Sequence, residues 1–474
     1  MAASSSSDRR MRGFKRWMKQ QDIECSDALL LSATDGSLSI SVKALADLKE
    51  GDVVAIIPKQ SCLTTKTSAA TELIEEAGLG GNIGLVVAIM YEKSLGPLSN
   101  WFRYFQILPS FEPIPLLWSL PEIDSLLCGT ELHKTVKEDK ALVHQDWKEC
   151  IKPLLASFDL NPDFFTIDEY FAAKSLVASR AFEIDEYHGF GMVPLADLFN
   201  NKTAAENVHF TFVSSTSDSD SDTENGKTDD SDKKEHNEPI ALDFPLETEA
   251  SSHSSSPLQQ GPTYMEMIVV KDCKAGDEVF NTYGSLGNAA LLHRYGFTEL
   301  GNPFDILNID LETVLEWSSS FLSSRSSRRR VSLWRKLGYC GCVSQNSEYF
   351  EVSFEGEPQV ELLILLHIML LPEKEFYELS VAEAVVAGIP GGFLPTIGSD
   401  ESKRKLLLTQ KVRKALVSLA NARESLYDVK LLEEEERLLG ECCVATHPKT
   451  YYSLVLRIGE RRIIEKLRSF AGED

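Results

Sequence analysis

The sequence predicts an α+β protein with two regions, and the spacing of apolar residues carries that prediction. Short runs of aliphatic and β-branched residues open the chain, at 29–31, 38–40 and 53–58. Turn residues such as Lys49-Glu50-Gly51-Asp52 connect them, as expected between strands. From residue 300 onward the apolar residues recur with the period of a helix, so we expect an all-α second region over 300–474.

The first region is predicted to begin at Gly13. The stretch GFKRWMKQQDIE places Phe14, Trp17 and Met18 on one side of a helix, which is typical of an amphipathic opening helix. Residues 1–12 are rich in serine and arginine and too few for a normal targeting segment. We therefore expect a short disordered tail over 1–12 and a first domain over 13–299.

A helical insertion is predicted inside this first domain, over about 68–170. Helical apolar spacing occurs at 83–90, 116–127 and 147–155, and prolines separate these stretches. A helical module between two sheet segments could build one wall of a cleft. It could equally be scaffold.

The segment over about 213–262 is predicted to be a disordered acidic loop. Between Asp218 and Glu249 there are twelve acidic residues and three lysines, so little of it can be buried. Plausible strands flank it at 207–210 and 264–270, and we expect them to pair. A tolerated surface insertion is the favoured interpretation, because loop entropy grows slowly with length. The alternative is an acidic tether that attracts a basic substrate or is tuned by serine phosphorylation.

Composition indicates which kind of partner the protein binds and in which compartment it acts. The formal net charge of −24 argues against binding nucleic acid directly and suits a basic protein partner. No run of eighteen apolar residues occurs, so we expect no membrane span. Nine scattered cysteines are typical of a reducing compartment. The nucleus or cytoplasm is therefore predicted, and the chloroplast is disfavoured.

Two short clusters have competing interpretations. The pairs Cys340/Cys342 and Cys442/Cys443 could bind zinc, but buried thiols fit their spacing better, so no metal is predicted. The basic run Arg325, Arg328, Arg329 and Arg330 could be a nuclear-import or nucleic-acid patch. A solvated helix face is the favoured interpretation.

The stretch from Lys274 to Phe297, KAGDEVFNTYGSLGNAALLHRYGF, predicts a turn, a strand over 278–283 and a helix. Ser285 is the expected helix cap and Gly296 the expected left-handed residue after its end. Tyr283 and Tyr295 each end one of these elements beside a glycine. They could converge on one small cavity, or they could be two core tyrosines.

Three ordered motifs give the chain a resemblance to a known family. They are SRAF at 179–182, GMVPLADLFNN at 191–201, and the EVFNTYG and LLHRYGF parts of the stretch above. In this order and spacing they resemble the SET-domain protein lysine methyltransferases, in the branch of Rubisco large-subunit methyltransferase and the ribosomal lysine methyltransferases. The resemblance covers the whole chain. It implies a SET-domain β-core with the helical insertion, followed by an all-α substrate-binding domain.

The resemblance also implies an activity and a set of site residues. The expected reaction is methyl transfer from S-adenosylmethionine to a lysine side chain in a protein substrate. The resemblance implies that Tyr283 is the catalytic residue next to the methyl group, that Tyr295 lines the lysine channel and that Asp197 supports the substrate wall. The residues implied to bind the cofactor are Arg180, Asn200, Asn201, Tyr283, Ser39 and Ser41. Alternatively, Arg180 and Asp197 could form a structural ion pair, and Asn200 could cap a turn.

The chain departs from the family pattern at two places. Ser39-Ile40-Ser41 stands where the family has Gly-x-Gly, and Asn201 stands where it has histidine. These departures keep open a SET-like binding scaffold with weakened catalysis. A histidine methyltransferase is the other alternative, and Tyr295 argues against it. A monomer that acts on a basic protein, such as a ribosomal protein, is the expected assembly and substrate.

Overall fold

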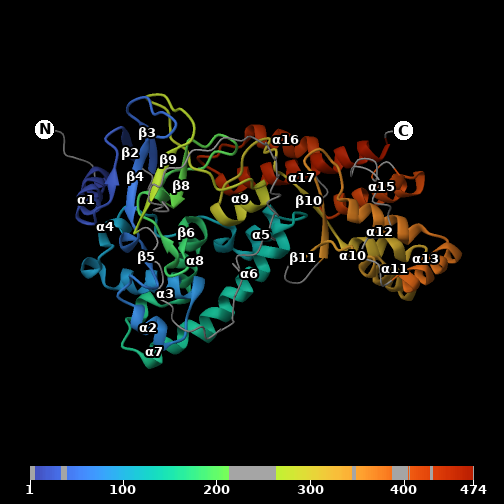
Figure 1. Cartoon of the computed structure of the whole chain (residues 1–474), viewed down its shortest axis with the longest axis horizontal. Helices are drawn as coiled ribbons and strands as arrows, with labels where there is room; N and C mark the ends of the chain where they lie inside the picture. The colour runs from blue at the N-terminus through green and yellow to red at the C-terminus, as the bar shows by residue number, and fades with distance from the viewer. Residues whose placement is uncertain are drawn as a thin grey trace, which may run out of the picture.

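A computed structural model describes most of the chain. The described residues are 6–33, 40–212, 263–343, 348–386, 404, 406–427 and 431–472. The predicted acidic loop at 213–262 lies outside them, as does Ser39. Figure 1 shows the N-terminal strands at one end of the molecule and the C-terminal helices at the other, with helix α9 between them. No helix among the described residues is long and apolar enough to cross a membrane.

The first domain is built on small antiparallel sheets. Its largest sheet has the order β1-β4-β9-β8, formed by Glu24–Cys25, Val53–Pro58, Tyr264–Val269 and Val208–Phe212. Strands β2 (Leu29–Ala33) and β3 (Ile40–Ala44) form a pair. A third sheet has the order β5-β7-β6, formed by Leu63–Thr64, Gly189–Met192 and Ala181–Asp185. The predicted pairing of the strands on either side of the acidic segment is confirmed, since Phe212 lies opposite Met265 and Val208 opposite Val269.

Helix α1 (Ser6–Gln20) covers one side of this domain. It buries Phe14, Trp17 and Met18, as the sequence pattern predicts. It begins at Ser6, so the prediction of a disordered tail over 1–12 is wrong for residues 6–12. The polar residues there give no apolar signal for a helix, although Asp8 suits a first helical turn.

The insertion is helical as predicted and continues to the end of α8. Its helices are α2 (Thr71–Glu76), α3 (Gly81–Ser94), α4 (Phe102–Phe105), α5 (Leu120–Leu126), α6 (Leu132–Asp146), α7 (Lys152–Ser157) and α8 (Ile167–Arg180). Short 3₁₀ turns lie at Lys59–Ser61, Gly96–Leu98, Pro115–Leu117, Pro162–Phe164 and Ala196–Leu198, and a π turn lies at Trp147–Ile151. Helix α3 buries every residue from Leu85 to Met90, so it is a core helix.

The C-terminal region is mainly helical, but the all-α prediction is too narrow. Its helices are α10 (Leu311–Ser319), α11 (Ser324–Lys336), α12 (Val360–Leu370), α13 (Glu373–Val386), α15 (Gln410–Glu424), α16 (Leu432–Glu441) and α17 (Pro448–Gly472). A three-stranded sheet accompanies them, with the order β10-β12-β11 formed by Leu307–Asp310, Glu348–Val352 and Cys342–Val343. These strands are too short for a clear alternating pattern.

The basic run of α11 is only partly the solvated helix face that the sequence favoured. Arg330 is buried and donates to the carbonyl of Ile368 near the end of α12, where free carbonyls need donors. It also lies over the ring of Phe376 and pairs with Glu373. Arg325, Arg328 and Arg329 are exposed, as expected for a solvated face.

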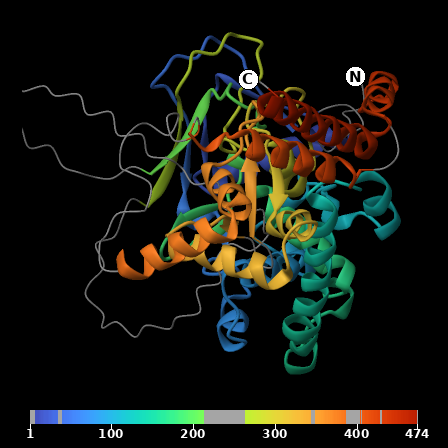
Figure 2. The ribbon, with the colours of Figure 1, turned by 90° about the vertical axis from the view of Figure 1, so that its right-hand side faces the viewer.

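An apolar cluster joins the insertion, α9 and the C-terminal region. Its buried members are Trp118, Ile123, Leu127, Leu132, Val136, Ala289, Leu292 and Leu456. Figure 2, seen from the C-terminal end, shows the orange and red helices in front of the blue strands. Because α9 carries Tyr295 at its end, this cluster fixes the position of that tyrosine relative to both regions.

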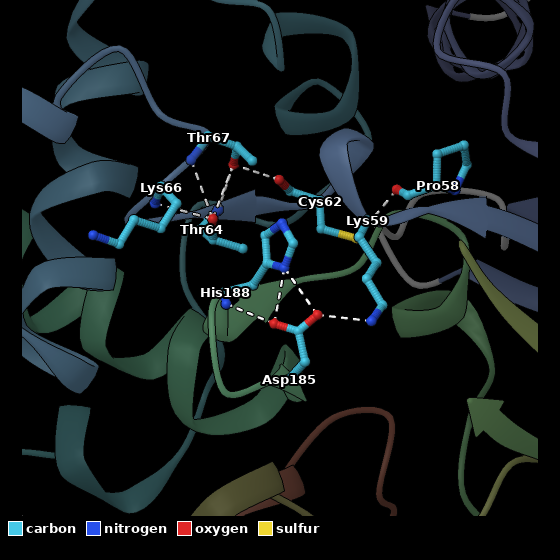
Figure 3. A network of polar contacts seen from close by, with 8 residues as sticks. All are labelled: Pro58, Lys59, Cys62, Thr64, Lys66, Thr67, Asp185 and His188. Carbon is cyan, nitrogen blue, oxygen red and sulfur yellow. Dashed lines mark hydrogen bonds and ion pairs between the residues drawn. The ribbon is translucent and has the colours of Figure 1, made fainter. Parts of the chain in front are cut away.

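A polar network ties the end of β4 to the β6–β7 hairpin (Figure 3). Lys59 Nζ lies 2.7 Å from Asp185 Oδ2, and its side chain is buried. His188 donates its backbone N–H to Asp185 Oδ1 at 2.7 Å, and its ring nitrogen lies 2.9 Å from the same oxygen. Partial burial would raise the pKa of Asp185, but the Lys59 and His188 contacts outweigh it and hold the pKa at about 2.

We predict that Asp185→Asn lowers the free energy of unfolding at pH 7 by about 2 kcal/mol, because Lys59 loses its counter-ion. A depressed pKa contributes stability that is present above about pH 4, the value in the unfolded chain, and is lost as pH falls toward 2. Urea unfolding at pH 7 and pH 3 should therefore show a smaller gap between the two proteins at pH 3. An equal gap at both values would contradict this role.

Candidate active site

Two segments about eighty residues apart cross at the centre of the first domain. Asn281 N–H donates to the carbonyl of Asn200 at 2.9 Å, and Val279 N–H donates to the carbonyl of Val42 at 2.8 Å. The segment 278–283 is not the regular strand that the sequence predicts. It makes only isolated bridges, between Lys43 and Glu278 and between Asn201 and Asn281. Its bridge partners are divided between β3 and the turn at Asn201, so no continuous ladder forms along it.

Asn200 and Asn201 both form hydrogen bonds with the segment 278–283. Asn200 donates its side-chain amide to Glu278 Oε1 at 2.7 Å. Asn201 accepts the backbone N–H of Tyr283 through Oδ1 at 2.9 Å. The amide nitrogen of Asn201 is buried without a hydrogen-bond partner among the described residues, and so is the hydroxyl of Thr203. Buried polar groups are rarely left unsatisfied, so these two are candidates to bind a polar ligand.

Tyr283 and Tyr295 converge as the sequence allowed. Their rings stack with centroids 4.2 Å apart and an angle of 24° between the planes. The hydroxyl of Tyr283 lies 3.5 Å from the carbonyl of Phe199, in the turn before Asn200. Burial raises the pKa of Tyr283 well above the ordinary value for tyrosine and also raises the pKa of Tyr295, so each phenol keeps its proton at neutral pH.

Helix α9 (Asn288–Tyr295) places Tyr295, and its two ends are fixed differently from each other. Gly296 has φ of 79°, which confirms the predicted left-handed residue after the helix. Ser285 does not cap the helix, so that prediction is wrong. The carboxylate of Asp305 accepts the N–H of Asn288 at 2.6 Å and its side-chain amide at 2.9 Å. This long-range capping interaction ties the start of α9 to the junction with the C-terminal region.

Arg180 and Asp197 form the structural ion pair that the sequence left open. Arg180 donates to Glu112 at 2.6 Å, to the carbonyl of Asp197 at 2.9 Å and to its carboxylate at 3.3 Å. Tyr104, fully buried, donates its hydroxyl to the same carboxylate at 2.7 Å. Burial raises the pKa of Asp197 to about 6, although Arg180 and Tyr104 oppose that shift.

This network supports a strained turn next to the site. Leu195 has φ of 80°, a conformation that is costly for a residue with a branched side chain, and it is fully buried. Arg180 holds the backbone two residues later, at the carbonyl of Asp197. We therefore describe Arg180 and Asp197 as positioning residues. Their direct contact with cofactor or substrate stays a prediction.

The remaining predicted site residues are less constrained. Ser41 lies on β3 opposite Ser32 of β2 and is half-buried, so its cofactor contact also stays a prediction. Sequence reasoning missed Glu112, Glu278 and Asp305. Each is a carboxylate whose partner lies far along the chain, and local spacing carries no signal for such pairs.

The cysteine pairs are not the buried thiols that the sequence favoured. Cys340 and Cys443 are exposed, and Cys342 and Cys442 are half-buried. No group of three or more histidine, cysteine, aspartate or glutamate side chains in the described ranges is arranged to hold a metal ion.

Comparison with known proteins agrees with this geometry. No protein-family model matches the chain. The N-lysine methyltransferase setd6 of Xenopus tropicalis is 24% identical to it over 96% of this chain and 93% of the relative. SETD6 of Mus musculus is 23% identical over 77% of this chain and 71% of its own length.

Two solved structures share the fold over nearly the whole chain. One is the SET domain of LSMT bound to lysine and AdoHcy, with a TM-score of 0.64 and 17% identity over 99% of this chain and 92% of that one. The other is Rubisco LSMT bound to AdoMet, with a TM-score of 0.61 and 18% identity over 98% and 91%. The chain therefore shares the SET-domain fold of these two structures. By sequence, the chain is similar to the N-lysine methyltransferases named SETD6.

We predict that Arg180→Ala lowers the free energy of unfolding by about 3–5 kcal/mol, because Glu112 and Asp197 are left as unpaired buried charges. Arg180→Lys should lower the free energy of unfolding by less than Arg180→Ala, because lysine keeps the positive charge although it cannot bridge both carboxylates. Urea unfolding of the three proteins measures this order. Equal stability of Arg180→Ala and the wild type would show that the network does not hold the turn.

Proposed function

We propose that this protein transfers a methyl group from S-adenosylmethionine to the side-chain amine of a lysine in a protein substrate. The observation that carries the proposal is the convergence of Tyr283, Asn200 and Asn201 at the crossing, with Tyr295 stacked on Tyr283. The relatives named N-lysine methyltransferases and the AdoMet-bound neighbour support the same reaction.

The residues at the crossing fit the proposed cofactor. The unpartnered amide of Asn201 and hydroxyl of Thr203 are suited to the polar groups of a nucleoside or an amino acid. When bound, S-adenosylmethionine supplies an electrophilic methyl group on a sulfonium. Asn200 and Asn201 would hold the cofactor, and Tyr283 would border the methyl group.

The target amine must be neutral to accept the methyl group. A free lysine has a pKa near 10.4, so the neutral form at pH 7 costs about 4 kcal/mol. An apolar, aromatic channel lowers that cost by disfavouring the ammonium form, and the two stacked rings provide such a wall. The Tyr283 phenol, which keeps its proton, then orients the amine by hydrogen bonding and is not the base.

Charge and cysteine content support a basic substrate and a reducing compartment. The chain carries 72 acidic and 48 basic residues, so its overall field attracts a basic protein such as a ribosomal protein. Nine unpaired cysteines fit the nucleus or cytoplasm, and we propose a monomer.

We expect Tyr283→Phe to lower the rate of methyl transfer by on the order of 10², because one oriented hydrogen bond at the reacting centre is lost. The assay is labelled S-adenosylmethionine with cell extract, with the labelled lysines identified by mass spectrometry. Tyr187→Phe is the matched control, since Tyr187 is 65% exposed on a surface turn. Undiminished labelling by Tyr283→Phe, or label on histidine, would refute this assignment.

A further inference from the structure

A basic groove lies along helix α1, outside the site described above. It has a volume of about 720 Å³, and α1 contributes Arg12, Lys15, Arg16, Met18 and Lys19 to its lining. The other lining residues lie between α1 and the start of β2 or directly after β3: Ile23, Cys25, Ser26, Asp27, Leu29, Leu30 and Leu45. Four cations therefore face one carboxylate, in a chain whose net charge is −24.

Three of these four cations lie on the side of α1 that faces away from the core. Helix α1 packs through Phe14, Trp17 and Met18, and the indole of Trp17 donates to the carbonyl of Asn100 at 2.7 Å. Lys15, Arg16 and Lys19 lie on the opposite face and are exposed. None of these three forms an ion pair with any residue that the structure describes. Their positive field is available to a partner.

Exposed leucines also line the groove. Leu30 is 38% exposed and Leu45 is 56% exposed, and both line the groove beside the cations. Figure 1 shows α1 at the outer edge of the molecule, beside β2 and away from the C-terminal helices. Because cations and exposed leucines line the same groove, a ligand that fills it has to carry both acidic and apolar groups.

We propose that this groove binds an acidic peptide segment of a partner protein that also carries apolar side chains. Carboxylates of the peptide pair with Lys15, Arg16 and Lys19, and its apolar side chains pack on Leu30 and Leu45. A nucleic-acid backbone would leave the leucines uncovered, since it offers phosphates but no apolar side chains. A flat anionic lipid surface would not fill a concave groove of this volume.

The test uses full-length protein and a fluorescein-labelled peptide of repeated Glu-Glu-Leu-Ser units, with fluorescence anisotropy as the readout. We expect saturable binding that weakens as salt rises, no binding of a Lys-Lys-Leu-Ser repeat, and weaker binding of a Glu-Glu-Ser-Ser repeat. Lys15→Glu with Arg16→Glu should weaken binding by about tenfold or more, because like charges then oppose each other. Leu30→Ser with Leu45→Ser should weaken it as well.

Matched controls separate the groove from general charge and hydrophobicity. Lys411→Glu with Lys414→Glu changes two exposed lysines on α15, and Leu98→Ser changes a leucine that is 85% exposed. Both should bind the peptide like the wild type. Circular dichroism of each variant checks that α1 and the fold persist, which the exposure of the changed side chains favours.

Three results would overturn the proposal. One is peptide binding that the Lys15/Arg16 reversal leaves unchanged. Another is binding only after deletion of residues 213–262, which would make the acidic segment of the chain itself the occupant. The third is sedimentation with phosphatidylserine vesicles, lost in the same reversal, without peptide binding. Because the readout is binding and not methyl transfer, failure here leaves the proposed activity untouched.

Discussion

The crossing of residues 196–201 with 278–283 is the constraint on which the rest of the structure depends. One backbone hydrogen bond, from Asn281 to Asn200, fixes two distant segments against each other. Two side-chain bonds, from Asn200 to Glu278 and from Tyr283 to Asn201, join the same segments. Neither segment is regular secondary structure there, so neither could hold its shape alone. The sheets, the insertion and the C-terminal helices can be understood as supports for this one contact.

The supports act from two sides. On one side, Glu112, Tyr104 and Arg180 surround Asp197 and hold the turn at Leu195 in its strained conformation. Such strain persists only where the surroundings over-determine the backbone, and it is common next to functional sites. On the other side, Asp305 caps α9, and Leu456 of α17 belongs to the same buried cluster as Leu292 of α9. The C-terminal region thereby helps to position Tyr295.

Much of this fold can be predicted from the sequence, because it rests on local periodicity. The strands at 53–58 and 264–270, the core helix around 83–90 and the long C-terminal helices all follow from apolar spacing. The pairing of β8 with β9 across the acidic segment also follows, since both strands alternate and no other candidate flanks it.

The failures share a physical cause, which is that they depend on partners far along the chain. Ser285 has the chemistry of a cap, but the carboxylate of Asp305 occupies that position. Arg330 is part of a basic run, yet its carbonyl partners on α12 bury it. Residues 278–283 have the composition of a strand, but the segment opposite them offers no ladder of partners. At the site, residue types could be predicted, whereas the hydrogen bonds that orient them could not.

The buried polar groups without hydrogen-bond partners bear more directly on function than the positions where the chain differs from the family motif. Asn201 replaces the usual histidine, yet its carbonyl oxygen holds Tyr283 and its amide nitrogen remains unpartnered among the described residues. An asparagine can therefore serve both the backbone and a ligand at this position. This dual use favours an active enzyme over a scaffold that has lost its cofactor.

Isothermal titration calorimetry with S-adenosylmethionine is the most direct measurement of that claim. Wild-type protein should bind the cofactor, and Asn201→Ala should bind it about tenfold or more weakly, because a buried hydrogen-bond donor to the ligand is removed. Absence of binding to the wild type at about 1 mM, or equal affinity of the two proteins, would contradict it.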